Sequence, residues 1–197
     1  SSAASDVYKR QIVDRYKQPI GVHCHNDSGL AAANTLMAVS AGALHVQGTI
    51  NGVGERCGNV SLATVLPNLV LKMKKDTKTE LNLTDLSSLV KFTYDIMNMH
   101  PDTQAPFIGK SAFAHKGGIH VSAVMKDSNM YEHIDPKLVG NKQRVLVSDL
   151  SGKSNISFKA NELDIKYKDS KEITGKLVSK VKDLEFEGYQ FEAADAS

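Results

Sequence analysis

Two histidines that are two residues apart could bind a metal ion. His23 and His25 follow the short apolar stretch 19–22, which has the character of a buried strand. Because side chains two apart in a strand point to the same face, the two imidazoles can converge on one point. Imidazole nitrogen and amide oxygen together suit a divalent cation such as Zn²⁺, Mn²⁺ or Mg²⁺. Two histidines at a strand end can also simply be hydrogen-bonded, so the spacing alone leaves both interpretations open.

A second polar cluster has the composition of a ligand-binding loop. The segment 51–59 reads Asn-Gly-Val-Gly-Glu-Arg-Cys-Gly-Asn and contains three glycines. Glycine lets the backbone approach a ligand closely. Glu55 and Arg56 form a charged pair that a plain connecting loop would not need.

The elements that must position these clusters are predicted as strand, helix and parallel strand. Segment 28–41 carries apolar residues at helical spacing, and segment 44–50 has the pattern of a second strand. Polar residues gather at the carboxyl end of each strand, which is where α/β barrels build their active sites.

The two clusters resemble the signature motifs of the 2-isopropylmalate, homocitrate and citramalate synthase family. The resemblance implies a (β/α)8 barrel that condenses acetyl-CoA with a 2-oxo acid. In the family, two histidines and the last Asn of the second motif bind a divalent metal (Mg, Mn or Zn). By that resemblance His23, His25 and Asn59 are the expected metal ligands, and Glu55 and Arg56 are expected near the acetyl-CoA and metal site.

Later segments resemble most the branch of the family that forms citramalate. This implies the condensation of acetyl-CoA with pyruvate to (R)-citramalate and CoA, in isoleucine biosynthesis. The alternatives are a 2-isopropylmalate synthase, which uses 2-oxoisovalerate in leucine biosynthesis, and an inactive binding or scaffold fragment. The segments that carry the resemblance are 107–124, 131–136, 139–141, 144–149, 151–155 and 188–197.

Two residues beyond the barrel are expected to be catalytic. The family places a His and a Tyr from the post-barrel segment near the thioester, and His120 and Tyr131 match those positions. His115 is five residues before His120 and would not share its helix face, so it is expected to be structural. In the family this segment crosses to a partner subunit, which implies a homodimer with crossed linker domains.

The domain organisation follows from the same comparison. The chain has 197 residues, fewer than the ~250 of a complete barrel. Nothing in it corresponds to the family's opening strand or middle strands. The expected fold class is therefore α/β: the C-terminal part of a (β/α)8 TIM barrel followed by a mostly helical linker domain. The expected parts are 1–11, a non-native leader; 12–98, barrel units and the following helix; 99–150, a linker subdomain; and 151–197, a helical subdomain leading to a missing regulatory domain.

Local patterns predict further elements. Segment 60–75 is a predicted helix in which Pro67 causes a kink or break. Thr84 is the predicted N-cap of the next helix. Short-range patterns predict a turn of helix over 136–140, an extended segment over 143–149 and a helix over 173–184.

Composition limits the classes of partner. The formal net charge is +2 with both signs interspersed, which points to neither a nucleic-acid nor a membrane surface. The two cysteines, Cys24 and Cys57, lie inside the motifs. This favours a reduced, cytoplasmic protein over a disulfide framework.

Overall fold

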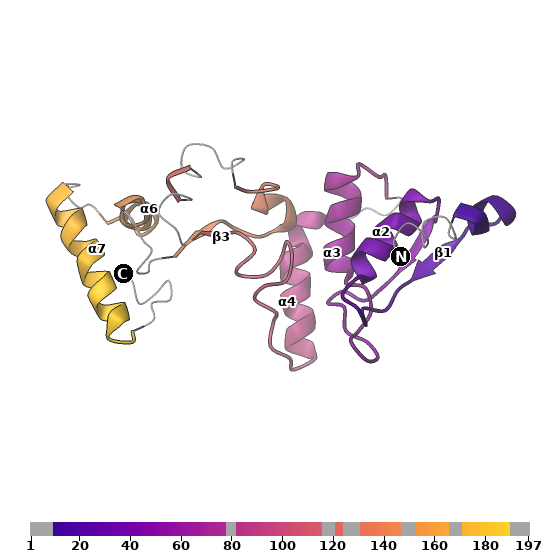
Figure 1. Cartoon of the computed structure of the whole chain (residues 1–197), viewed down its shortest axis with the longest axis horizontal. Coiled ribbons are helices and arrows are strands. Elements are labelled where there is room, and N and C mark those ends of the chain that lie inside the picture. Colours follow the sequence, from indigo (N-terminus) through magenta and orange to yellow (C-terminus); the bar gives the residue numbers. More distant parts are fainter. Residues whose placement is uncertain are drawn as a thin grey trace. The chain divides into compact units, whose positions relative to one another are not determined.

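The computed structural model describes residues 10–77, 82–115, 121–123, 131–146, 153–165 and 171–189 (Figure 1). The described part is mixed α/β. The chain divides into two compact units: Ser1–Ala112 with Leu138–Asn141, and Phe113–Lys137 with Lys142–Ser197.

The first unit begins with the predicted strand–helix–strand arrangement. β1 (Gly21–His23) pairs in parallel with β2 (His45–Gln47), and α2 (Ala31–Ser40) connects them. Gly21 lies opposite His45, and a side chain on Gly21 would press on that imidazole, whose Cδ2 lies 3.3 Å from the position of a Cβ. The prediction of two parallel strands joined by a helix is confirmed.

The predicted kink or break at Pro67 takes the form of a change of helix type, and the chain stays helical through the proline. α3 (Leu62–Pro67) ends at the proline, and a π-helix, η1 (Asn68–Lys72), continues from it. Proline has no N–H to donate to the preceding turn. One residue further along, the Asn68 side chain donates from Nδ2 to the Thr64 carbonyl at 2.9 Å.

Two apolar clusters pack on α3 and hold the unit together. Ala31 at the start of α2 packs with Val60, Val65 and Leu69. In the second cluster, Ala63 packs with the buried residues of α4 (Leu86–Ile96) and of the turn before it. The helix that follows the second motif is therefore fixed by apolar contacts from α2 and from α4.

The prediction that Thr84 caps α4 is wrong. The residue before α4 is Asp85, which makes no capping hydrogen bond, and Asn82 caps the preceding turn: its Oδ1 accepts from the Thr84 backbone N–H at 3.3 Å and from the Thr84 hydroxyl at 2.6 Å. The chain makes a 3-10 turn, η2 (Leu83–Asp85), before α4 begins. Because the 3-10 turn precedes α4, the capping side chain lies at the start of that turn and Thr84 lies inside it.

Leu138–Asn141 belongs to the first unit through polar contacts. Ser87 Oγ donates to the Val139 carbonyl at 2.8 Å. The Asn141 side-chain amide donates to the carbonyls of Phe107 and Gly109 at 3.0 and 3.1 Å. The predicted short helix at 136–140 is present as a 3-10 helix, η4 (Pro136–Val139).

The second unit contains a small parallel sheet and two helices. β3 (Ala114–His115) pairs with β4 (Arg144–Val145), and α6 (Lys153–Glu162) packs against α7 (Lys171–Phe186). The predicted extended segment is confirmed at β4, and the predicted C-terminal helix is confirmed as α7. Within the ranges that the structure describes, no helix is both long and apolar enough to cross a membrane.

Candidate functional site

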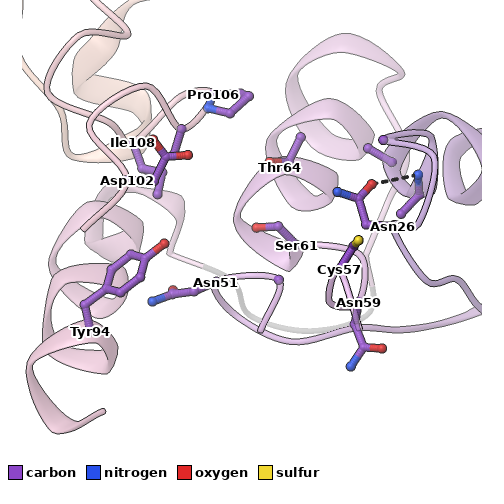
Figure 2. A pocket seen from close by; sticks show the side chains of 15 residues that line it. Asn26, Asn51, Cys57, Asn59, Ser61, Thr64, Tyr94, Asp102, Pro106 and Ile108 are labelled. Atoms are coloured by element: carbon purple, nitrogen blue, oxygen red, sulfur yellow. Dashed lines mark hydrogen bonds between the residues drawn. The ribbon is translucent and has the colours of Figure 1, made fainter. Parts of the chain in front are cut away.

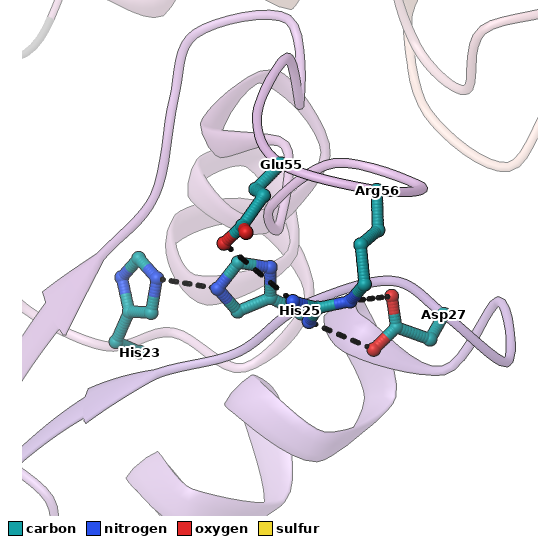
Figure 3. Close-up of polar contacts among 5 residues, drawn as sticks. All are labelled: His23, His25, Asp27, Glu55 and Arg56. Atoms are coloured by element: carbon teal, nitrogen blue, oxygen red, sulfur yellow. Dashed lines mark hydrogen bonds and ion pairs between the residues drawn. The ribbon is translucent and has the colours of Figure 1, made fainter.

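The first motif forms the turn that leads from β1 to α2. His23 ends β1, and its Nε2 lies 3.3 Å from Nε2 of His25 (Figure 3). The rings meet edge to face, with centroids 5.1 Å apart. The next residue, Asn26, accepts from the Ala31 backbone N–H at 3.2 Å and so ties the turn to the start of α2. The predicted convergence of the two histidines is confirmed.

The second motif folds against the first along its backbone. Gly58 accepts from the Asn26 N–H at 2.9 Å, and the Val60 N–H donates to the Cys24 carbonyl at 2.9 Å. Between these bonds, His25 and Asn59 face each other as an antiparallel bridge. The two motifs therefore interlock, and Asn59 is held beside His25.

The glycine at 58 is required by the space inside this loop. Its φ is +89°, and a Cβ there would lie 2.1 Å from the Gly52 carbonyl oxygen. The same oxygen accepts from the Asn59 N–H at 2.9 Å. A side chain at position 58 would thus displace the backbone that carries Asn59.

These groups fit a divalent metal. Two nitrogens bound to one ion at about 2.1 Å each lie about 3.0–3.4 Å apart at octahedral or tetrahedral angles, and the imidazole nitrogens are separated by 3.3 Å. Asn59 Oδ1 is buried without a hydrogen-bond partner. Within the described ranges, no group of three His, Cys, Asp or Glu side chains could hold a metal. A direct hydrogen bond between His23 and His25 accounts for the same distance.

Arg56 is fixed by a carboxylate of the first motif. Its guanidinium donates from Nε and from Nη2 to the two oxygens of Asp27, both at 3.0 Å (Figure 3). Glu55 lies 3.5 Å from Nη1. The hydrogen bond from Arg56 lowers the pKa of the Asp27 carboxyl below its ordinary value, and that carboxylate raises the pKa of Arg56. Both side chains are about half exposed.

Sequence analysis missed Asp27 as a site residue. The signal was its place in the first motif, two residues after His25. The structure brings Glu55 and Arg56 together with Asp27 on the same pair of loops as the histidines. The predicted contact of Glu55 and Arg56 with an acyl donor stays a prediction.

The residues expected to be catalytic belong to the second unit. His120 lies outside the described residues. Tyr131 is about half exposed, and the next residue, Glu132, is buried. Glu132 Oε1 lies 3.2 Å from Nε2 of His115 and accepts from the Gln143 amide at 3.0 Å. This contact fits the structural role expected of His115, and the segment next to Tyr131 is anchored by a buried carboxylate.

Comparison with known proteins relates both units to one group of enzymes. Residues 6–92 match the HMGL-like family, starting inside the stretch predicted to be a leader, and residues 107–188 match the homocitrate synthase post-HMGL domain-like family. The chain is 50% identical over 189 residues to "(R)-citramalate synthase" of Aquifex aeolicus. The aligned stretch covers 95% of this chain and 36% of the relative.

Two further relatives extend this comparison. The chain is 52% identical to "(R)-citramalate synthase" of a Synechocystis species over 93% of this chain and 34% of the relative. It is 40% identical to "Probable 2-isopropylmalate synthase" of Methanopyrus kandleri over 88% of this chain and 34% of the relative. The chain spans about a third of the length of the curated relatives it matches. It belongs to the 2-isopropylmalate, homocitrate and citramalate synthase family.

Proposed function

We propose that this chain supplies part of the active site of an acyltransferase that condenses acetyl-CoA with pyruvate to give (R)-citramalate and CoA, a step of isoleucine biosynthesis. The observation that carries the proposal is the pair of interlocked loops, which hold the two imidazole nitrogens 3.3 Å apart beside Asn59. The similarity to (R)-citramalate synthases supports pyruvate as the 2-oxo acid. The free state of both cysteines accords with a cytoplasmic location.

The roles of the residues follow from the chemistry. His23, His25 and Asn59 would hold a divalent metal (Mg, Mn or Zn). When bound, such a metal polarises the keto group of a 2-oxo acid and offsets the negative charge that forms on its oxygen. His120 and Tyr131 would handle the proton that leaves the methyl group of the acetyl donor. Arg56, held by Asp27 in a fixed orientation, keeps the second loop closed over the first.

The proposed architecture is the C-terminal part of a (β/α)8 barrel followed by a linker domain, within a longer protein. The strand–helix–strand arrangement in the first unit and the HMGL-like match support this. The chain alone is then expected to release no CoA from acetyl-CoA and pyruvate. Metal-dependent release by the purified 197-residue chain would contradict this division of the active site.

The function is tested in the full-length protein by CoA release. Pyruvate should be the preferred 2-oxo acid, and His23→Ala should abolish metal-dependent turnover and weaken Mn²⁺ binding measured by calorimetry. Tyr131→Phe and His120→Ala should lower kcat by about 10²-fold or more, with little change in metal affinity. Tyr189→Phe, at an exposed tyrosine of the same unit, is the matched control and should leave kcat unchanged.

A second candidate is 2-isopropylmalate synthesis, which the similarity to the Methanopyrus kandleri protein favours. A higher kcat/KM with 2-oxoisovalerate than with pyruvate would select it. Negligible turnover with both acids would leave the third alternative, an inactive binding or scaffold role.

The crossed homodimer has its own test. A dimer mixed from a His120→Ala chain and a chain disabled at His23 and His25 should regain part of its activity, because one active site then carries neither change. No recovery in verified mixed dimers would exclude the crossed arrangement.

A further inference from the structure

The exposed face of the two-stranded sheet carries polar side chains beside the proposed metal site. In both β1 and β2 the middle residue is half-buried and the two end residues are exposed. Val46, the middle residue of β2, packs against the apolar cluster around Val65. Because side chains alternate along a strand, His23 of β1 and His45 and Gln47 of β2 lie together on the opposite, exposed face.

Gln47 is the direct neighbour of His23 on this face. The parallel register pairs His23 with Gln47 and Gly21 with His45. Paired residues of neighbouring strands are about 5 Å apart, so the flexible Gln47 side chain can reach the His23 ring without a movement of the backbone. His45 is one pair away, and its imidazole lies over Gly21, where a Cβ would be 3.3 Å from its Cδ2. Gln47 is therefore the polar side chain placed to contact His23.

His23 has one ring nitrogen that faces the proposed metal site and one that does not. Its Nε2 lies 3.3 Å from Nε2 of His25 (Figure 3). Among the residues that the structure describes, its Nδ1 has no hydrogen-bond partner. A histidine that binds a metal through one ring nitrogen almost always donates the N–H of the other, and this second bond fixes the tautomer and the ring orientation. A partner for Nδ1 is therefore the part of the site that remains to be assigned.

The other polar side chains of the two motif loops have different partners. Asn26, Asn51 and Ser61 line a cavity of about 320 Å³ in the first unit (Figure 2), and each bonds to a backbone group. Thr49 donates its hydroxyl to a backbone carbonyl of the second motif at 2.7 Å. The carboxylates of the two motifs are paired with Arg56. All of these side chains are thus engaged away from the first imidazole.

We propose that Gln47 is the positioning residue for His23: its side-chain carbonyl accepts the N–H at Nδ1 of the imidazole, so that Nε2 keeps its lone pair for the divalent metal. The inference rests on the proposed function, because it assigns a partner to one of the proposed metal ligands. Gln47 is exposed and makes no side-chain hydrogen bond within the described ranges, so no other contact there competes for its amide. It acts through His23 and touches neither the metal nor the substrate.

The test is Mn²⁺ binding to the full-length protein, measured by isothermal titration calorimetry. Gln47→Met removes the acceptor but nearly keeps the length and volume of the side chain, and it should raise the Kd for Mn²⁺ about tenfold or more. Gln47→Glu keeps an acceptor oxygen and should bind Mn²⁺ at least as tightly as the wild type. Gln18→Met, at an exposed glutamine before β1, is the matched control and should leave the Kd unchanged.

The two substitutions at position 47 separate positioning from packing. Met and Glu are both close to Gln in size, so a role limited to packing would affect both variants alike or neither. Equal Kd values for Mn²⁺ in the wild type and Gln47→Met, or a loss in Gln47→Glu as large as that in Gln47→Met, would overturn the assignment of Gln47.

The outcomes also separate this inference from the proposed function. If Gln47→Met bound Mn²⁺ normally while the wild type released CoA in a metal-dependent way, the proposed function would stand without the role of Gln47. If the wild type bound no Mn²⁺, or if His23→Ala bound it equally well, the metal site would be refuted and the role of Gln47 with it. Loss of Mn²⁺ affinity in Gln47→Met and its recovery in Gln47→Glu, in a protein without turnover of pyruvate, would support the role of Gln47 and refute the reaction.

Discussion

Replacing Gly58 by alanine should disconnect the two motifs. A Cβ at this position would lie 2.1 Å from the Gly52 carbonyl oxygen, whereas real Cβ atoms stay at least 3.0 Å away, so the loop must open by about 0.9 Å. The Asn59 N–H to Gly52 bond and the Asn26 N–H to Gly58 bond are both 2.9 Å long. The opening would lengthen them to about 3.8 Å, beyond hydrogen-bond range.

The magnitude follows from these two bonds and the backbone conformation. Each lost hydrogen bond costs about 1 kcal/mol. Alanine at a left-handed φ adds about 1–2 kcal/mol. The free energy of unfolding should therefore fall by about 3–4 kcal/mol in Gly58→Ala. Gly29→Ala is the matched control, because Gly29 also has a positive φ, +71°, but no atom lies within 4 Å of the added Cβ. It should cost only the conformational part, about 1–2 kcal/mol.

The assay is urea unfolding of both variants and the wild-type chain, followed by far-ultraviolet circular dichroism. Calorimetric titration with Mn²⁺ or Zn²⁺ provides a second readout, since the displaced backbone carries Asn59. Gly58→Ala should lose metal affinity, and Gly29→Ala should retain it. Equal losses of stability in the two variants would show that the contact between Gly58 and Gly52 does not hold the loops together.

Two further outcomes are expected. Because Arg56 lowers the pKa of Asp27, their ion pair stabilises the fold fully above the carboxyl's ordinary pKa and ceases to do so as the pH falls through the lowered pKa. The difference in urea midpoint between wild type and Asp27→Asn should therefore be constant above about pH 5 and vanish toward about pH 2. A difference that persists in acid would contradict this account of the ion pair. His115→Ala leaves the buried Glu132 carboxylate with one partner fewer and should lower the free energy of unfolding by about 1–3 kcal/mol. Lys176→Ala, which breaks an exposed ion pair, should change the free energy of unfolding by under about 0.5 kcal/mol. Thermal unfolding of the two variants distinguishes these values.

The sequence predicted those parts of the site that depend on local spacing. The convergence of His23 and His25 follows from strand geometry, and the parallel pairing of β1 and β2 follows from the apolar runs and the helix between them. Pro67 marks the point where the regular α-helix ends, as its missing N–H suggested, although the helix continues in another form. In each case the information lies within a few residues of the feature.

The parts that could not be predicted depend on contacts between distant segments. Arg56 contacts Asp27 from a backbone with a left-handed φ of +58°. A left-handed φ is expected at glycine, and the sequence has arginine at this position, so it gives no sign of that conformation. Tyr94 is buried, and its place in one cavity wall with Asp102 and Ile108 depends on how the segment 102–108 folds back. Before α4, the sequence predicted Thr84 as the cap, but a 3-10 turn forms first and Asn82 caps that turn.

The π-helix after Pro67 has a consequence for insertions and deletions in this region. A π-turn closes with a bond from residue i+5 instead of i+4 and therefore holds one extra residue. Met73 makes such a bond to the Asn68 carbonyl, at 2.8 Å. Deleting Val70 would let the segment return to α-helical geometry, with four residues covering the turn that five cover now, so the later side chains would keep their angular positions. Leu69, upstream of the deletion, and Met73, downstream of it, should then both keep their contacts with the apolar cluster around Val65. The wide turn is therefore a place where this helix can lose one residue without moving the side chains on either side of it.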